Sequence, residues 1–444
     1  MTRTLIKDTN DFVGKKVTVA GWVNSKRSYG KLVFIDLRDR SGILQIVGNE
    51  ILAELKDEFV VEITGNIRDR AEKYFNDKII TGKIELEAES IKILSQADEM
   101  PFDIHQPELN VTLPVLLDNR SLSFRNQKVS EVFKVQETIV KTFREFLGKQ
   151  DFTEIQIPTI VATATEGGSE LFSIDYFGKK AYLAQSPQFY KQIMVSIFER
   201  VFTVAHAYRA EPSVTTRHIT EYVGLDCEWG FIESWEDIMN IADGVIKAIL
   251  KAIKENHQNV LDDYKIEIPQ TVKETPKVKL QEALQIIFDR TGRDIRGEPD
   301  LDPEGEREIC KYAFEKFGSD IIFITHFPTK KRPAYAYPDP ENPTETLSFD
   351  LLGKGVEWIT GGQRIHDYKT LQESFKSRGI DISSFEKPYF EAFKFGMPPE
   401  GGFCIGLERI TQNILELENI RQASLFPRDM ERVDTRLNSV DDKK

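Results

Sequence analysis

The chain has only three cysteines in 444 residues and contains no long apolar run. Cys227, Cys310 and Cys404 lie far apart and form no Cys-x-x-Cys pair, so the sequence indicates neither a disulfide framework nor a zinc site. No segment approaches the ~18 apolar residues of a membrane span, and the first residues lack the apolar core of a signal peptide. We therefore expect a cytoplasmic protein with buried thiols.

An excess of positive charge is also absent. The formal net charge is −13, which argues against indiscriminate nucleic-acid binding because that needs a broadly basic surface, although a local basic patch is compatible with it. Charged residues make up 30% and apolar residues 40% of the chain, as in ordinary globular proteins. The length predicts two or three domains.

The first region, residues 1–103, contains five short apolar runs separated by turn signals. This spacing predicts short strands that close into a small β-barrel. Phe34 in the second run is either a core residue or an exposed aromatic, and Gln45 is polar within an apolar run, which favours a binding role. The runs are Lys16–Val23, Lys31–Leu37, Ile43–Val47, Phe59–Ile63 and Lys83–Leu86.

A proline-containing stretch of mixed polarity follows, and we expect a hinge or linker over residues 104–127. Residues 128–444 then form the second domain. It opens with a predicted helix that ends near Gly148, because apolar residues recur at helical spacing, and a short strand over Phe152–Pro158 comes next. Ile238–Ile253 also has a helical pattern.

The most informative segment is Tyr208–Tyr222, which combines Arg209, Arg217 and His218 with two carboxylates. An apolar run precedes it and an alternating run follows it, so we predict a hairpin with the charges on its loop. Guanidinium groups match phosphate oxygens in pairs, which favours a site for a polyanion such as a triphosphate. From the charges alone, a salt-bridged surface hairpin is the alternative.

Two more segments suit a ligand that carries a carboxylate. Ser186 and Pro187 predict a helix start, and Gln188 and Lys191 then share one helical face, where an amide and an ammonium suit a carboxylate. An exposed helical lysine is the alternative. Arg364 follows paired glycines, which allow close approach of a ligand while the guanidinium forks onto a carboxylate.

A metal site is indicated within Ser348–His366. Two carboxylates, Asp350 and Glu357, with the nearby Thr360 hydroxyl offer hard oxygen ligands of the kind that Mg²⁺ prefers, and the phosphates of a bound polyanion would complete its shell. Strict strand alternation would put Glu357 and Thr360 on opposite faces, so we expect a local twist or a water molecule to connect the hydroxyl to the metal.

Several of these segments resemble the class II aminoacyl-tRNA synthetases. Residues 128–158 resemble motif 1, the dimer-forming element, Tyr208–Tyr222 resembles motif 2, and Gly401–Ile410 resembles motif 3, although the family usually has glycine at Cys404. The N-terminal runs resemble the OB-fold anticodon-binding domain of the aspartyl, asparaginyl and lysyl enzymes. The expected fold is therefore α+β: an OB-fold barrel and a catalytic domain built on an antiparallel sheet flanked by helices.

Details of the motifs look most like the aspartyl enzymes. The Thr215–His218 signature and the Leu425–Asp429 ending carry this likeness. Once the strands and helices of a catalytic fold are allowed for, no spare segment of ~100 residues remains between His218 and Gly401 for an extra domain, which resembles the compact archaeal and eukaryotic forms. The implied enzyme activates L-aspartate with ATP and transfers it to tRNA(Asp), with tRNA(Asn) open as a second acceptor. The implied cofactor is Mg²⁺, and the implied assembly is a homodimer.

The resemblance also implies a role for individual residues. Arg209 and Arg409 would be catalytic, and Glu166 would lie in a Gly-Gly loop that closes over the amino acid. The implied ATP-binding residues are Arg209, Glu211, Arg217, His218, Tyr222, Glu357 and Arg409. The implied aspartate-binding residues are Glu166, Gln188, Lys191, Asp226, Thr360 and Arg364, the metal ligands are Asp350, Glu357 and Thr360, and the anticodon-binding residues are Arg27, Phe34 and Gln45.

Two alternatives stay open. One is an asparaginyl or lysyl enzyme of the same subclass, against which Lys191 and Arg364 speak. The other is a non-catalytic RNA-binding paralogue, which Cys404 and the unusual segment Arg332–Tyr337 keep under consideration.

Overall fold

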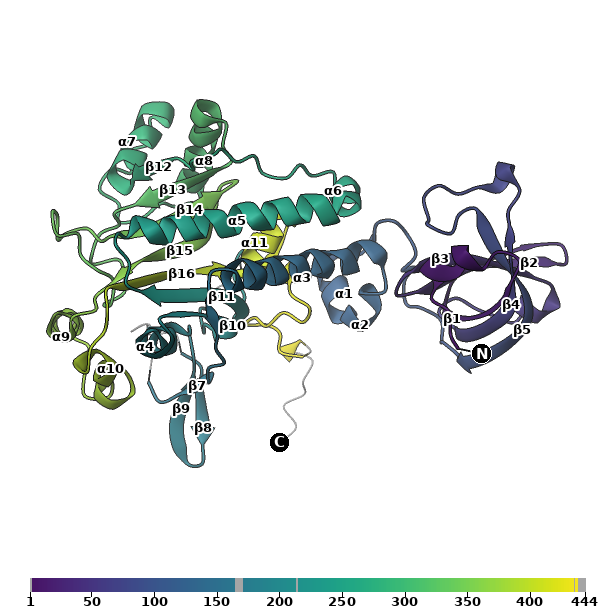
Figure 1. The fold of residues 1–444 in the computed structure, drawn as a ribbon, viewed down its shortest axis with the longest axis horizontal. Coiled ribbons are helices and arrows are strands. Elements are labelled where there is room, and N and C mark those ends of the chain that lie inside the picture. The colour runs from purple at the N-terminus through teal and green to yellow at the C-terminus, as the bar shows by residue number, and fades with distance from the viewer. Residues whose placement is uncertain (1, 164–170, 213–214, 435, 438–444) are drawn as a thin grey trace. The chain divides into compact units, whose positions relative to one another are not determined.

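The computed structural model describes residues 2–163, 171–212, 215–434 and 436–437 (Figure 1). The chain divides into two compact units, residues 1–110 with 125–127, and residues 111–124 with 128–444. No helix among these described residues is long and apolar enough to cross a membrane. The two units are described separately below.

The first unit is a closed five-stranded barrel with strand order β1-β2-β3-β5-β4. Alternate residues of each strand face inward, so that Val33, Ile35 and Leu37 of one strand are buried in the barrel core. The predicted barrel is confirmed, and each predicted run lies within or overlaps one strand. The strands are β1 (Lys16–Tyr29), β2 (Leu32–Asp39), β3 (Gly42–Gly48), β4 (Val60–Asp69) and β5 (Ile84–Ser95), with 3₁₀ turns at Ile6–Phe12, Glu50–Leu52 and Glu72–Tyr74.

The second unit is built on an eight-stranded sheet with order β12-β13-β14-β15-β16-β11-β10-β6. The six central strands are antiparallel, as expected, whereas the edge strands β6 and β12 pair in parallel with their neighbours, so the whole sheet is mixed. The strands are β6 (Thr153–Glu154), β10 (Arg200–Tyr208), β11 (Glu221–Gly230), β12 (Lys277–Lys279), β13 (Ile321–Thr325), β14 (Ser348–Gly353), β15 (Val356–Arg364) and β16 (Glu400–Gly406).

One face of this sheet is covered by the long helices α3 (Gln127–Gly148) and α5 (Glu236–Asn256), which run side by side in Figure 1. Their apolar stripes and α11 (Leu407–Ile414) form the largest core with the strands. A Cβ on Gly244 would lie 2.7 Å from the Phe146 ring, so glycine is what lets the two helices approach so closely. Both predicted helices are thus present.

Helices of the described residues cover the opposite face at its two ends. At one end, α4 (Gln188–Phe198), α9 (Tyr368–Ser377) and α10 (Glu391–Lys394) enclose a small aromatic core. At the other end, α7 (Leu280–Thr291) and α8 (Pro303–Phe317) pack on β13 and β14. The middle of this sheet face, crossed by β15, β16 and β11, is left available for a site.

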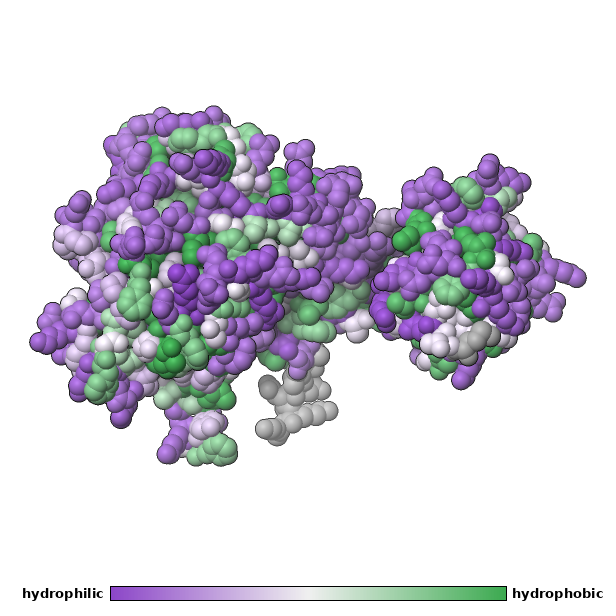
Figure 2. All heavy atoms as spheres, viewed as in Figure 1, coloured by the Kyte–Doolittle hydropathy of each residue, from purple (hydrophilic) through white to green (hydrophobic). Residues whose placement is uncertain are grey.

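The remaining elements are short. Residues 104–127 are more ordered than a linker, since α1 (Leu113–Asp118) and α2 (Arg120–Ser123) lie within them and bury Leu116 and Leu117. Figure 2 shows a mostly hydrophilic surface with hydrophobic side chains around α4 and the β8–β9 hairpin, where Phe177 and Ile197 are exposed. The other elements are β7 (Ile160–Val161), β8 (Ser173–Tyr176), β9 (Lys179–Leu183), α6 (Gln258–Tyr264), a π-helical turn Glu386–Phe390 and a 3₁₀ turn Ile420–Ala423.

Candidate active site

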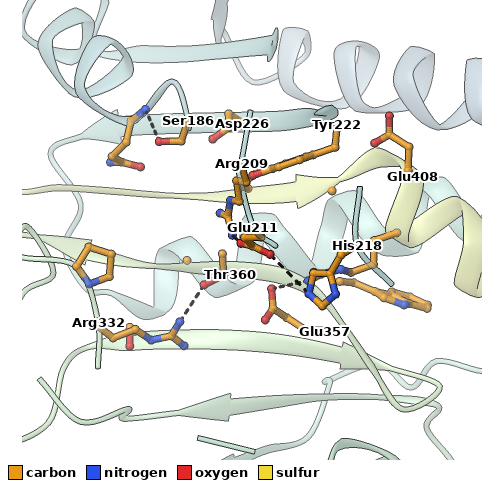
Figure 3. Close-up of a pocket in the computed structure, with 18 of the residues that line it drawn as sticks. Ser186, Arg209, Glu211, His218, Tyr222, Asp226, Arg332, Glu357, Thr360 and Glu408 are labelled. Carbon is orange, nitrogen blue, oxygen red and sulfur yellow. Dashed lines mark hydrogen bonds and ion pairs between the residues drawn. The ribbon is translucent and has the colours of Figure 1, made fainter. Parts of the chain in front are cut away.

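A cavity of about 360 Å³ lies over the middle of the uncovered sheet face. Side chains from α4, the β10–β11 hairpin, β15, β16 and α11 form its wall (Figure 3). Asp350 is paired with Arg332 of that wall, and Glu166 lies outside the described residues. The predicted site residues that the cavity brings together are Gln188, Lys191, Arg209, Glu211, Arg217, His218, Tyr222, Asp226, Glu357, Thr360, Arg364 and Arg409.

The charged loop closes the predicted hairpin, in which β10 and β11 pair from Arg200 opposite Trp229 to Tyr208 opposite Glu221. The Arg209 guanidinium lies 5.5 Å from the centre of the Tyr222 ring, and its Nη1 lies 3.6 Å from Glu211 Oε1. Figure 3 shows Glu211 and His218 turned toward each other, with His218 Nε2 3.9 Å from Glu211 Oε2. These charges face a cavity, so the segment is not the salt-bridged surface hairpin that was the alternative.

Two more arginines of the cavity are held by carboxylates from distant elements. Arg217 Nη1 lies 3.3 Å from Glu306 Oε2 of α8, and Arg409 Nη1 lies 3.3 Å from Glu357 Oε1 of β15. Burial, together with the nearby charge of Glu357, raises the pKa of Glu306 from 4.5 to about 7. A polyphosphate entering here would compete with these carboxylates for the same guanidinium groups.

A β-bulge removes the difficulty that strict alternation posed for Glu357 and Thr360. The β14–β15 register pairs Asp350 with Thr360 and Leu352 with Glu357, and it shifts by one residue at Trp358. Directly opposed residues share a face, so Asp350, Thr360 and Glu357 all lie on the cavity side of the sheet. The expectation that Glu357 and Thr360 lie on opposite faces was therefore wrong.

The floor of the cavity contains a chain of buried charges. Lys191 Nζ lies 2.8 Å from Asp226 Oδ1 and 3.2 Å from Glu228 Oε2, and Arg364 Nε donates to Glu228 Oε1 at 2.8 Å. Lys191 is 1% exposed, so it is not an exposed helical lysine. Burial alone would lower the pKa of Lys191, but Asp226 and Glu228 raise it above its ordinary value.

Two donor and acceptor positions in this floor remain available to a ligand. Within the described residues, Asp226 Oδ2 is buried and accepts no hydrogen bond, which suits a substrate ammonium. Arg364 donates through Nη2 to the Gly402 carbonyl oxygen at 3.1 Å, and its Nη1 donates to none of the described residues. A zwitterionic amino acid could thus find both an anion and a cation.

Cys404 lines the part of the cavity that contains Asp226. In the strand register it is opposite Asp226 on one side and Thr360 on the other. A Cβ on Gly224 would come within 2.5 Å of Asp226 Oδ2 and 3.4 Å of Cys404 Sγ, so the glycine makes room for both groups. The thiol therefore fits the floor of the site.

Sequence reasoning missed several residues of the site. Glu228 follows Asp226 by two positions, so strand alternation already places both on one face. Glu400 is fully buried and accepts from Gln192 Nε2 at 2.7 Å, and burial followed by the charge of Glu228 raises its pKa well above the ordinary value. No local pattern distinguishes Glu400, whereas Arg332 belongs to a segment that the sequence marked as unusual without indicating a role for it.

Glu408 gives the site a pH dependence that can be measured. Its carboxylate accepts the Val223 N–H and is nearly inaccessible, and burial raises its pKa from 4.5 to about 7. Between pH 4.5 and 7 the Glu408 carboxyl keeps its proton in the folded protein but loses it in the unfolded chain. The free energy of unfolding therefore decreases as pH rises from 4.5 through 7, by at most about 3 kcal/mol from this group.

Replacing Glu408 with glutamine should remove that dependence, because the amide carbonyl still accepts from Val223 but carries no proton to lose. We expect the variant to match the wild type in unfolding temperature near pH 5 and to exceed it at pH 8. Thermal unfolding between these pH values is the measurement. A constant difference across the range would contradict the prediction.

The predicted anticodon residues lie on the outer face of the barrel unit. Arg27 is opposite Phe34 in the β1–β2 register, and Asp36 is opposite Gln45 in the β2–β3 register. Phe34 is half-buried between the core residues Val33 and Ile35, which settles that it points outward. Arg27 Nη2 donates to Asp36 at 3.2 Å, and Gln45 Nε2 donates to Glu85 at 2.7 Å.

Comparisons with known proteins agree over nearly the whole chain. The family model of class II tRNA synthetases (D, K and N) matches residues 112–430, and that of the OB-fold nucleic acid binding domain matches residues 17–94. An aspartate–tRNA(Asp/Asn) ligase of Aeropyrum pernix is 40% identical over 441 residues, which covers 97% of this chain and 98% of the relative.

Solved structures of two related enzymes share the fold. An asparaginyl-tRNA synthetase of Pyrococcus horikoshii with asparaginyl-adenylate has a TM-score of 0.88 at 29% identity, covering 98% of this chain and 99% of that one. An aspartyl-tRNA synthetase of Entamoeba histolytica has a TM-score of 0.85 at 28% identity, covering 98% and 93%. The chain therefore belongs to the class II tRNA synthetases of the aspartate, lysine and asparagine group.

Proposed function

We propose that the protein is an aspartate–tRNA ligase, which activates L-aspartate with ATP and transfers it to the 3′ end of tRNA(Asp). The observation that carries this assignment is the pair of buried cations, Lys191 and Arg364, on the floor of the cavity. A carboxylate side chain can form a second ion pair with the Arg364 guanidinium, which already binds Glu228, whereas a neutral amide offers it no charge. The names of the curated relatives support the same substrate.

The reaction has two steps. The aspartate carboxylate attacks the α-phosphorus of ATP, giving aspartyl-adenylate and pyrophosphate, and the terminal ribose hydroxyl of tRNA then takes the aspartyl group and releases AMP. We assign Arg209 to the α-phosphate, Arg217, His218 and Arg409 to the outer phosphates, and Tyr222 to the base. No protein nucleophile is needed, because positioning and charge neutralisation account for most of the rate in such chemistry.

The residues of the site also fit a divalent cation. Enzymes of this class use ATP and are generally metal-dependent. Asp350, Glu357 and Thr360 share the cavity face, and two of them already bind one cation, Arg332. No three carboxylate, histidine or cysteine side chains of the described ranges surround one point, so Mg²⁺ held here would need phosphate oxygens, as is usual for this ion. Bound there, it would neutralise charge on the phosphates.

We propose that the two units have separate functions. We assign anticodon binding to residues 1–103, a hinge to residues 104–127 and aminoacylation to residues 128–444. The family models matched over residues 17–94 and 112–430 support the first and last of these assignments. We further propose a homodimer formed through α3 and the edge strand β6, which correspond to motif 1. The cytoplasmic location stays a prediction.

The amino acid is tested directly by ATP–pyrophosphate exchange with aspartate, asparagine and lysine in parallel. We expect exchange with aspartate alone. Exchange with asparagine would instead favour the asparaginyl enzyme, a rival supported by the likeness to the Pyrococcus horikoshii structure. Absence of exchange with all three would favour a non-catalytic RNA-binding protein. Charging tRNA(Asp) and tRNA(Asn) transcripts side by side would then decide whether the enzyme accepts both.

Replacing Phe34 with alanine should weaken tRNA binding while leaving adenylate formation intact. Stacking of one base on an aromatic ring is worth about 1–3 kcal/mol, so the KM for tRNA should rise roughly tenfold or more. Tyr74 is another aromatic residue of the barrel unit, 59% exposed where Phe34 is half-buried, and its alanine variant is the control. Equal KM values for the two variants would show that Phe34 has no specific role.

A further inference from the structure

The segment Arg332–Tyr337, which sequence analysis singled out without explaining, brings a guanidinium into the active-site cavity. Arg332 Nη2 donates to Asp350 Oδ1 at 2.7 Å, and Nη1 donates to Thr360 Oγ1 at 3.1 Å (Figure 3). The arginine therefore binds two of the three side chains that we assign to the metal. Neither motif resemblance nor the family comparison assigns a role to it.

Arg332 is held firmly in this position. Its guanidinium lies 3.8 Å from the centre of the Phe327 ring, at a distance typical of a cation–π contact. Its carbonyl oxygen accepts from Arg378 Nη1, and Arg378 Nη2 donates to the Thr329 carbonyl oxygen at 2.6 Å. Both ends of the residue are thus fixed, and the side chain is only 15% exposed.

A guanidinium and a divalent cation cannot occupy the same two oxygens. Two cations bound to the same oxygens would repel each other strongly in this partly buried place. Each would also depend on the negative charge of Asp350 to balance its own positive charge. Moving the arginine away without a new partner would leave a desolvated guanidinium. The phosphates of a nucleotide in the same cavity offer such a partner, because guanidinium binds phosphate oxygens well.

On the basis of the proposed function, we propose that Arg332 holds Asp350 and Thr360 in the nucleotide-free enzyme, so that a divalent cation binds them only together with the nucleotide. Arg332 is then a positioning residue that makes metal binding conditional. The bare protein would resist loading by metal ions, and ATP and the cation would enter as a coupled pair.

Mn²⁺ binding followed by electron paramagnetic resonance tests this coupling without requiring turnover. Without nucleotide, the wild type should bind Mn²⁺ weakly, and Arg332→Gln should bind it at least about tenfold more tightly, because the competing charge is gone. Arg332→Lys keeps the charge but cannot bridge both oxygens, so it should fall between the two. A non-hydrolysable ATP analogue should tighten Mn²⁺ binding to the wild type much more than to Arg332→Gln.

Two controls locate the effect. Lys331→Gln removes a neighbouring positive charge that pairs with Asp300 and is 47% exposed, so this variant should behave as the wild type. Adding Asp350→Asn to Arg332→Gln should abolish the gain. A gain in Mn²⁺ affinity cannot be explained by damage to the fold. Equally weak Mn²⁺ binding by the wild type, Arg332→Gln and Arg332→Lys would overturn the proposal. The nucleotide-free measurements use neither aspartate nor tRNA, so their outcome is separate from that of the exchange assay.

Discussion

Replacing Arg209 with alanine is expected to abolish adenylate formation while leaving the fold intact. The guanidinium lies where the charged loop leaves β10 and faces the cavity, beside Glu211 and the Tyr222 ring. Loss of one preorganised donor to developing transition-state charge costs about 10²–10³ in rate, and loss of a full charge on the α-phosphate should reach or exceed the upper value. ATP–pyrophosphate exchange is the measurement.

Arg296→Ala is the matched control for this variant. The Arg296 side chain is 44% exposed against 46% for Arg209, and it forms an ion pair with Asp294 on the surface. Both variants should unfold at nearly the wild-type temperature, because surface ion pairs contribute little stability. Exchange near the wild-type rate in Arg209→Ala would refute the assignment of Arg209 to ATP.

The parts of the fold that the sequence predicted are those with strong local signals. The strand runs of the barrel are bounded by turn residues, and α3 carries an apolar residue on every turn of its buried face. The spacing of apolar residues and the positions of turn residues therefore indicated the same elements. The edges of the second sheet were less accessible to prediction. Only Thr153–Glu154 of the expected strand joins the sheet, since its pairing with β10 depends on contacts distant in sequence.

The site was predictable to the extent that its residues belong to local motifs. The charges of Tyr208–Tyr222 and the oxygens of Ser348–His366 are close in sequence, and Arg209, Arg217, His218, Glu357 and Thr360 all line the cavity. The bulge at Trp358 could not be inferred, because the register depends on the partner strand. Arg332 and Glu400 join the site through tertiary packing, so the sequence indicated no role for Glu400 and marked the segment of Arg332 only as unusual.

The second large effect concerns Arg364, whose replacement by glutamine should lower kcat/KM for aspartate by roughly 10³-fold or more. Arg364 is the buried cation bound to Glu228 and to the Gly402 carbonyl oxygen, and it lines the cavity. Glutamine cannot neutralise a carboxylate, so discrimination between aspartate and asparagine should decrease as well. ATP–pyrophosphate exchange with both amino acids measures the change.

Stability and specificity can be separated at this position. Arg364→Gln alone leaves Glu228 with Lys191 as its remaining charged partner, and breaking a buried pair in this way costs about 3–5 kcal/mol in unfolding free energy. The double variant Arg364→Gln with Glu228→Gln removes both charges and should recover most of that loss in urea unfolding. Aspartate activation should stay low in the double variant, because no guanidinium faces the substrate. If activation returned together with stability, Arg364 would be a structural residue and the choice of aspartate would have to be explained by Lys191.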